Sequence, residues 1–156
     1  MKRLLLSLTL LLACLVTTTA HTANRPDVLF IVIDDMNDWV SLLDPGSPIK
    51  TPNLERLMSQ GITFMHAYVQ QAYCAPSRNS FMSGRRPQTT NVFNSGVGEK
   101  HFRILGANWT AMPQHFKEQG WWTTGVGKSY HPNLPPNFDQ PMSWSDPIAW
   151  PYYYPK

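Results

Sequence analysis

The feature that most constrains this chain is a short apolar segment at residues 27–33, which is followed directly by Asp34 and Asp35. After its first residue the segment is apolar and rich in β-branched side chains, with no alternation of polar positions. This pattern is typical of a parallel strand buried on both faces. Parallel strands need long crossover connections, which are usually helical. The segment therefore predicts a central strand of an α/β fold with a mostly parallel sheet.

Helix and strand patterns alternate in the following sequence. We expect helices at residues 51–61, 76–83 and 110–119, and strands at residues 62–69 and 121–126. Thr51 suits the N-cap of the first helix, and Pro76 suits the first position of the second. Gly84 lies just past the end of the second helix. From residue 131 onward the chain has seven prolines and no periodicity, which predicts a long ordered loop.

Residues 1–20 have the pattern of a signal peptide. Lys2 and Arg3 precede an apolar segment at residues 4–16, which is too short for a comfortable membrane span. Small residues before position 21 provide a cleavage site. An alternative is a lipoprotein signal in which Cys14 is lipidated. Either interpretation predicts an exported protein without a membrane span. With the signal peptide at residues 1–20, residues 21–156 would form the N-terminal portion of one domain.

The charge balance and the cysteine count narrow the possible functions. The net charge is +3, and loss of the leader would leave 11 basic against 10 acidic residues. This near-balance does not indicate nucleic-acid binding, which usually needs a clustered basic face. Cys14 and Cys74 are the two cysteines. If Cys14 leaves with the leader, Cys74 has no partner in the chain, which suggests a free thiol, an intermolecular disulfide or special chemistry. The alternative is a small buried hydrophobe.

Asp34 and Asp35 form a candidate metal site. Two adjacent carboxylates at the carboxyl end of a buried strand repel each other, and a divalent cation would relieve that repulsion. Open α/β sheets place ligand sites at this end of their strands. Oxygen ligands suit Ca²⁺, and Mg²⁺ is possible. The alternative is a solvated turn between strand and loop.

A second motif has the sequence Cys74-Ala-Pro-Ser-Arg78. A helix that begins at Pro76 would place Cys74 just before its N-terminus, where free N–H groups favour an anion and lower a thiol pKa. Arg78 lies one turn further along and can bind an oxyanion through its planar fork. These features suit a tetrahedral oxyanion. The alternative is a capped helix with an incidental cysteine.

A third motif contains Lys128 and His131, which follow the strand expected at residues 121–126. A nucleotide-binding P-loop is excluded, because position 122 is Trp where that motif needs Gly. Lys128 can neutralise an anion, and His131 can hydrogen-bond a reacting hydroxyl. The alternative is a surface loop. Separately, Asn108-Trp-Thr is a sequon for N-glycosylation in a eukaryotic host, although Thr110 could simply cap a helix.

The ordered set of motifs over residues 26–131 resembles the type I sulfatases. The resemblance implies the alkaline-phosphatase-like fold, of which this chain would be the N-terminal part. It also implies that a modifying enzyme oxidises Cys74 to formylglycine. Asp34, Asp35 and residue 74 would then bind the metal. Arg78, Lys128 and His131 would act with residue 74 in catalysis.

Within the family, the segments around Cys74 and His131 are similar to the iduronate-2-sulfatase subfamily. This implies removal of 2-O-sulfate from uronates of glycosaminoglycans. The location would be lysosomal or extracellular in a eukaryote and periplasmic or extracellular in a bacterium. Family members are several times longer, so we expect the chain to be truncated and inactive alone. The alternatives are a phosphate or phosphonate monoester hydrolase of the same superfamily, or an inactive fragment.

Overall fold

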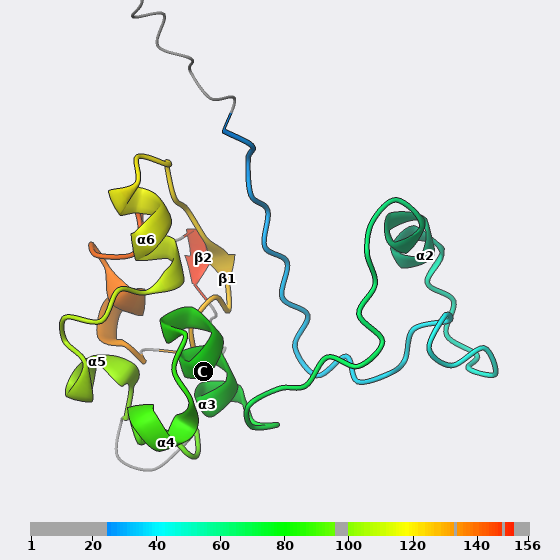
Figure 1. Cartoon of the computed structure of the whole chain (residues 1–156), viewed down its shortest axis with the longest axis horizontal. Helices are drawn as coiled ribbons and strands as arrows, with labels where there is room; N and C mark the ends of the chain where they lie inside the picture. Colours follow the sequence, from blue (N-terminus) through cyan, green and yellow to red (C-terminus); the bar gives the residue numbers. More distant parts are fainter. Residues whose placement is uncertain (1–24, 96–99, 133, 148, 152–156) are drawn as a thin grey trace, which may run out of the picture. The chain divides into compact units, whose positions relative to one another are not determined.

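The computed structural model describes residues 25–95, 100–132, 134–147 and 149–151. The signal peptide and the lipidation site predicted at Cys14 lie outside the described residues. The chain divides into two units, residues 1–31 and 32–156. The described part of the first unit, residues 25–31, is extended and exposed. Every element named below belongs to the second unit (Figure 1).

The second unit contains short helices and a small sheet. The elements in chain order are α2 (Pro52–Ser59), α3 (Cys74–Ser83), α4 (Pro87–Thr90), α5 (Phe102–Leu105), α6 (Met112–Glu118), β1 (Val126–Gly127), the 3-10 helix η1 (Pro136–Asp139) and β2 (Ala149–Pro151). The two strands pair in parallel, with Val126 opposite Ala149 and Gly127 opposite Pro151. A parallel pair of strands together with helices fits the predicted α/β fold class. A larger central sheet is not seen among the described residues.

The strands predicted at residues 27–33 and 62–69 do not form among the described residues. Both segments lack a hydrogen-bonded neighbouring strand. The apolar side chains of the first, from Val28 to Ile33, are between 38% and 84% exposed. The strand predicted at residues 121–126 is regular only at its end, where β1 begins. An apolar pattern can specify an extended backbone, but a strand needs a partner to bond with.

Helix α3 begins earlier than its sequence predicts. Cys74 is its first residue and Tyr73 its N-cap, and the Ser77 N–H donates to the Tyr73 carbonyl at 3.0 Å. Pro76 is therefore in the first turn, where its missing N–H removes no helical bond. Gly84 ends the helix in the left-handed region at φ 65°, as its position predicts. Cys74 thus belongs to the helix instead of preceding it.

Helix α2 agrees with the prediction in position but is not capped by its threonine. The helix begins at Pro52, after Thr51, and ends at Ser59. The Thr51 hydroxyl lies 3.0 Å from the Ser41 hydroxyl and does not bond to the helix backbone. None of the helix residues is buried, and Leu57 is 62% exposed.

Helix α6 is shorter than predicted at its N-terminal end. Its N-cap is Ala111, so the sequence-based alternative of a cap at Thr110 is wrong. The Gln114 side chain explains this start, because its Oε1 accepts a hydrogen bond from the Ala111 N–H at 3.3 Å. Gly120, with φ 88°, follows the end of the helix, and its N–H donates to the Lys117 carbonyl at 3.0 Å.

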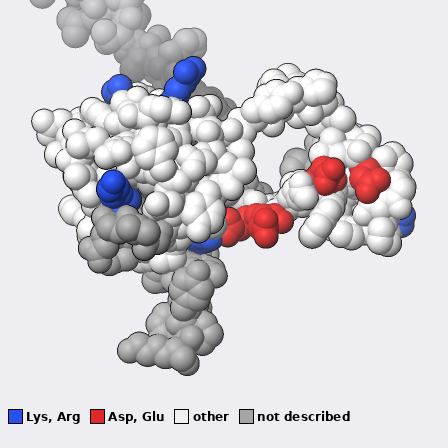
Figure 2. Space-filling model, turned by 90° about the horizontal axis from the view of Figure 1, so that it is seen from below, with Lys and Arg blue, Asp and Glu red and all other residues white. Residues whose placement is uncertain are grey.

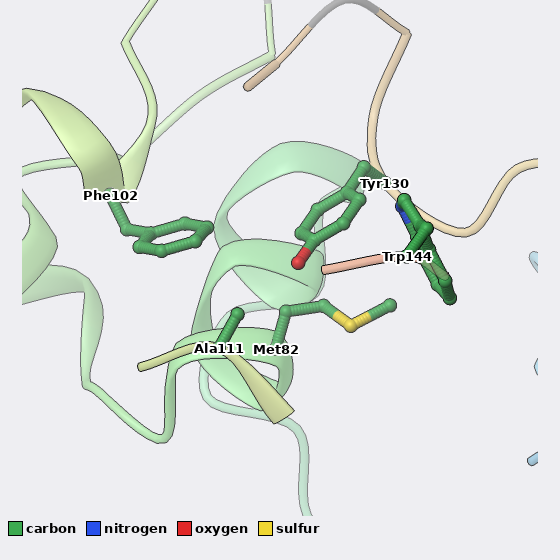
Figure 3. Close-up of a cluster of buried hydrophobic side chains, with 5 residues drawn as sticks. All are labelled: Met82, Phe102, Ala111, Tyr130 and Trp144. Atoms are coloured by element: carbon green, nitrogen blue, oxygen red, sulfur yellow. The ribbon is translucent and has the colours of Figure 1, made fainter. Parts of the chain in front are cut away.

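A small aromatic core packs on one side of α3, which contributes Met82 to it (Figure 3). Its buried members are Met82, Phe102, Ala111, Tyr130 and Trp144. The Tyr130 ring lies 6.3 Å from the Phe102 ring in a stacked arrangement and 6.2 Å from the Trp144 ring in an edge-on arrangement. The segment predicted as a long loop from residue 131 therefore contains a 3-10 helix and contributes a core residue.

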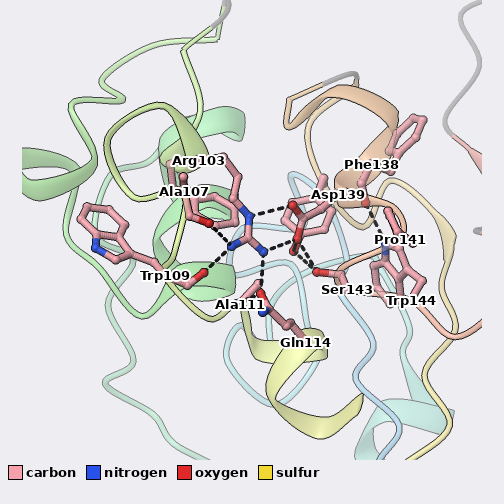
Figure 4. A network of polar contacts seen from close by, with 12 residues as sticks. Arg103, Ala107, Trp109, Ala111, Gln114, Phe138, Asp139, Pro141, Ser143 and Trp144 are labelled. Atoms are coloured by element: carbon pink, nitrogen blue, oxygen red, sulfur yellow. Dashed lines mark hydrogen bonds and ion pairs between the residues drawn. The ribbon is translucent and has the colours of Figure 1, made fainter. Parts of the chain in front are cut away.

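A buried polar network adjoins this core (Figure 4). Arg103 donates from Nε to Asp139 Oδ1 at 2.8 Å and from Nη2 to Asp139 Oδ2 at 2.6 Å. The two side chains are 9% and 4% exposed. Arg103 Nη2 also donates to Gln114 Oε1 at 2.7 Å, and the Ser143 hydroxyl donates to Asp139 Oδ2 at 2.5 Å. The network connects α5, α6, η1 and the segment that follows η1. In the described part of the chain, no helix has both the length and the apolar character to cross a membrane.

Candidate functional site

Three motifs that are far apart in the sequence meet around the Asp34 carboxylate. Arg78 Nη2 lies 3.1 Å from Asp34 Oδ1, and Lys128 Nζ lies 2.5 Å from Asp34 Oδ2. The same Lys128 Nζ lies 3.4 Å from the Cys74 Sγ. The carboxyl end of the first apolar segment, the start of α3 and the residue after β1 thus form one cluster.

Helix α3 places Cys74 and Arg78 together. Residues four apart on a helix lie on the same face, one turn apart. The Arg78 side chain is almost fully buried, and its guanidinium donates to the backbone carbonyl of Lys128 and, at 3.3 Å, to that of Ser129. Arg78 therefore holds the backbone after β1 against α3 in addition to contacting Asp34.

The charges of this cluster stabilise one another. The hydrogen bond from Lys128 lowers the pKa of Asp34, partial burial opposes this, and Arg78 lowers it further. Burial acts to lower the pKa of Lys128, but its hydrogen bonds to Asp34 and Cys74 outweigh burial and raise it. Lys128 is therefore a cation and Asp34 an anion at neutral pH. A positive charge is held next to the Cys74 sulfur.

His131 lies at the edge of the same cluster. Burial lowers the pKa of His131, the positive charges of Lys128 and Arg78 lower it further, and a hydrogen bond with the Ser95 backbone partly opposes them. Its imidazole is therefore neutral near pH 7 and able to accept a proton. The Nδ1 atom is buried and, among the described residues, has no hydrogen-bond partner.

Ser95 is a site residue that the motifs did not reveal. Its hydroxyl accepts a hydrogen bond from the Ala75 N–H at 2.9 Å, in the first turn of α3. Its backbone also interacts with His131. Ser95 thus connects the helix start at Cys74 to His131. The sequence signal was weak, since Asn94-Ser95-Gly96 reads only as a turn.

The expected metal donors do not form a cation site by themselves. Both Asp34 oxygens face cationic side chains, and Asp35 is exposed with a left-handed φ of 57°. Within the described ranges, no group of three or more His, Cys, Asp or Glu side chains is arranged to hold a metal. The metal ligation predicted for Asp34, Asp35 and Cys74 therefore stays a prediction.

The predicted glycosylation site is accessible. Asn108 and Thr110 are both exposed in the connection between α5 and α6. Exposure of the asparagine is required for modification but does not demonstrate it. Glycosylation at Asn108 therefore also stays a prediction.

A pocket of about 500 Å³ lies beside α3 but is separate from the cluster. Its lining includes Ser77, Phe81, Arg85 and Arg86 and none of the predicted catalytic side chains. The Arg85 guanidinium is fixed over the Trp109 ring, 4.8 Å from its centroid. On the face shown in Figure 2, Lys and Arg side chains stand at separate positions and form no continuous band.

Comparison with known proteins places these observations in one family. Residues 26–155 match the family described as Sulfatase. The human iduronate 2-sulfatase is 38% identical over 133 residues, which are 84% of this chain and 24% of that protein. The mouse iduronate 2-sulfatase is 37% identical over 150 residues, which are 91% of this chain and 26% of that protein. A sulfatase of Formosa agariphila is 36% identical over 115 residues, which are 72% of this chain and 23% of that protein. The chain spans about a quarter of the length of these curated relatives.

Proposed function

This chain belongs to the sulfatase family, and from that premise we propose that the complete natural protein is a sulfuric ester hydrolase whose nucleophile derives from Cys74. The observation that carries the proposal is the position of Lys128 Nζ, 3.4 Å from Cys74 Sγ, with Arg78 four residues along the same helix. A sulfate group bound at Cys74 would meet two fixed cations. Electrostatic stabilisation of this kind is usually the largest contribution to such a reaction.

We propose that a separate modifying enzyme, with an oxidant that it supplies, converts the Cys74 side chain to the aldehyde of formylglycine with loss of the sulfur. The Cys74 sulfur then stands for an oxygen of the hydrated aldehyde, which carries two hydroxyl groups on one carbon. One of these oxygens attacks the sulfur of the sulfate ester. The attacking hydroxyl gives up its proton, the bond from sulfur to the sugar oxygen breaks, and the sugar oxygen takes up a proton and leaves as a hydroxyl. Lys128 and Arg78 offset the negative charge that develops on the sulfate oxygens.

His131 is proposed as the base of the second step. It removes the proton from the remaining hydroxyl group, the bond between carbon and the sulfated oxygen breaks, and sulfate leaves as the aldehyde forms again. A neutral imidazole is needed for this task, and the lowered pKa of His131 keeps it neutral. A serine at position 74 would stop after the first step, because its sulfate ester has no second hydroxyl on the same carbon.

A divalent cation is part of the proposal for the complete protein. Ca²⁺ is the ion that the family resemblance implies, with Mg²⁺ as the alternative. Asp34 and Asp35 would supply two of the donors. Their arrangement here does not fit a cation site without further ligands. The proposed roles of Lys128, Arg78 and His131 do not depend on the metal.

The proposed substrate is a 2-O-sulfated uronate of a glycosaminoglycan in a lysosomal or exported compartment. Similarity to the iduronate 2-sulfatases supports this choice. The Arg85–Arg86 pair beside α3 adds a basic feature that suits an anionic polymer. A phosphate or phosphonate ester is the competing substrate class.

Mass spectrometry and a substrate panel test the function. The complete natural protein is expressed in a host known to modify other sulfatases, and the peptide that contains position 74 is examined for the aldehyde and its hydrate. Activity is compared on 2-sulfated uronates, aryl sulfates and phosphate monoesters, with Cys74→Ala as the inactive control. Free thiol alone at position 74 contradicts the nucleophile. Preference for phosphate esters contradicts the reaction class, and activity restricted to aryl sulfates contradicts the substrate.

A further inference from the structure

Tyr130 connects the cluster around Cys74 to the buried core. It lies two residues after Lys128 and directly before His131 in the sequence. Its side chain is fully buried, and its ring packs with Phe102 and Trp144 (Figure 3). One short segment therefore carries two proposed catalytic side chains and, between them, an anchor in the core.

The Tyr130 hydroxyl is held by groups that are themselves fixed. It lies 3.0 Å from the Ser143 hydroxyl and 3.5 Å from Asp139 Oδ2. Asp139 is fixed in turn by two hydrogen bonds from Arg103 (Figure 4). Burial and the negative charge of Asp139 raise the pKa of Tyr130, so the hydroxyl keeps its proton.

The two proposed catalytic side chains are held in different ways. Lys128 is fixed independently of Tyr130, because Arg78 contacts its backbone carbonyl and Asp34 contacts its ammonium group. His131 adjoins Tyr130, and its buried Nδ1 has no hydrogen-bond partner among the described residues. The imidazole is therefore held by its hydrogen bond with the Ser95 backbone and by the backbone that Tyr130 anchors.

We propose that Tyr130 is a positioning residue for His131: its buried hydroxyl, held by Ser143 and Asp139, fixes the backbone from which the imidazole reaches the reacting groups. This inference rests on the proposed function, since it assigns His131 to the second step. It adds a role for a side chain that touches neither the substrate nor Cys74.

Tyr130→Phe in the complete natural protein is a suitable test. The ring and its aromatic contacts remain, and Asp139 keeps its bonds from Arg103 and Ser143, so no buried charge loses its ion-pair partner. Thr90→Val is the matched control. Thr90 is also buried, at the end of α4, and its hydroxyl bonds within its own segment, where it accepts a hydrogen bond from the Val92 N–H at 3.4 Å.

A misplaced His131 would slow the second step and leave the first nearly unchanged. We expect kcat to fall on the order of 10-fold in Tyr130→Phe, while kcat/KM stays within about 2-fold. The sulfated enzyme should then accumulate, which a burst of desulfated sugar would reveal. Thr90→Val should show neither change. A mere loss of correctly folded enzyme would lower kcat and kcat/KM by the same factor, and that outcome would overturn the proposal.

Hydrogen–deuterium exchange gives a readout that does not require activity. Peptides covering residues 127–131 should exchange faster in Tyr130→Phe, while peptides covering α3 should not change. Unchanged exchange at residues 127–131, or uniformly faster exchange throughout the protein, would overturn the proposal. Faster local exchange with unchanged kcat in an active enzyme would also overturn it. If the parent protein has no sulfatase activity, the proposed function fails, and exchange alone decides whether Tyr130 anchors the segment.

Discussion

The ion pair between Arg103 and Asp139 offers the sharpest test of what stabilises this part of the chain. Both side chains are nearly fully buried, at 9% and 4% exposure. Asp139→Ala removes the acceptor of two guanidinium hydrogen bonds, at 2.8 and 2.6 Å, and of the Ser143 hydroxyl at 2.5 Å. It leaves Arg103 charged, buried and without its counter-ion.

The structure also indicates the size of the effect. Removing one partner of a buried ion pair typically costs about 3–5 kcal/mol, because the remaining charge is left uncompensated. Arg103 keeps acceptors at Gln114 and at two backbone carbonyls, those of Ala107 and Trp109. We therefore expect the lower end of the range, about 3 kcal/mol, for Asp139→Ala.

A double variant separates the charge effect from the packing effect. Combining Arg103→Met with Asp139→Leu removes both charges and fills similar volume, and such replacements are often nearly neutral. We expect the double variant to be more stable than Asp139→Ala by about 2 kcal/mol. Chemical denaturation of the complete natural protein and of each variant measures both differences in the free energy of unfolding. The slope of that free energy against denaturant concentration is compared between variants. A double variant as unstable as Asp139→Ala would refute the reasoning, as would a loss below about 1 kcal/mol in Asp139→Ala.

Three further expectations concern steric fit, proton binding and folding. Gly106→Ala should lower stability by about 1–3 kcal/mol in denaturation experiments, because a Cβ there would collide with the Trp109 indole. Gly46→Ala is the control, since its Cβ would lie 3.5 Å from the nearest atom, and equal losses would contradict the steric explanation. Because the pKa of His131 is lowered in the folded state, the folded state binds fewer protons than the unfolded state at acidic pH. The contribution of His131 to the free energy of unfolding should therefore decrease as pH falls below about 6.5. Lys128→Met removes a cation that lowers this pKa, so the acidic limb of the pH–rate profile should move to higher pH; a shift to lower pH would be the contrary result. The 156-residue chain by itself should show no cooperative thermal transition, because the apolar side chains of residues 28–33 are exposed; a sharp Ca²⁺-dependent transition with turnover would contradict this.

The sequence predicted those features that depend on residues close together in the chain. The helix around residues 76–83 was predicted because a proline and a glycine bracket it, although the structure begins it at Cys74. The sequence also placed Arg78 about one turn along the chain from Cys74, although it put Cys74 just before the helix and not in it. The sulfatase family was predicted from the order of the short motifs, and the family match to residues 26–155 confirms it.

Sequence patterns did not determine which segments form strands of the sheet. The apolar segments at residues 27–33 and 62–69 have the composition of strands, yet neither forms one among the described residues. A strand is completed by hydrogen bonds to a neighbour that lies elsewhere in the chain, so its pattern states a preference and not an outcome.

The family resemblance grouped Arg78, Lys128 and residue 74 in one site, but only the tertiary structure decided which of these distant side chains contact each other. Asp34 pairs with Arg78 across 44 positions and with Lys128 across 94 positions. The bond of Arg103 with Asp139, across 36 positions, had no signal in the sequence. Local propensities act over about one helical turn, whereas these contacts depend on how the chain returns upon itself. The folded chain therefore determines that a cation lies beside Cys74 and that Tyr130 is anchored next to His131, because burial and charge pairing act on neighbours in space.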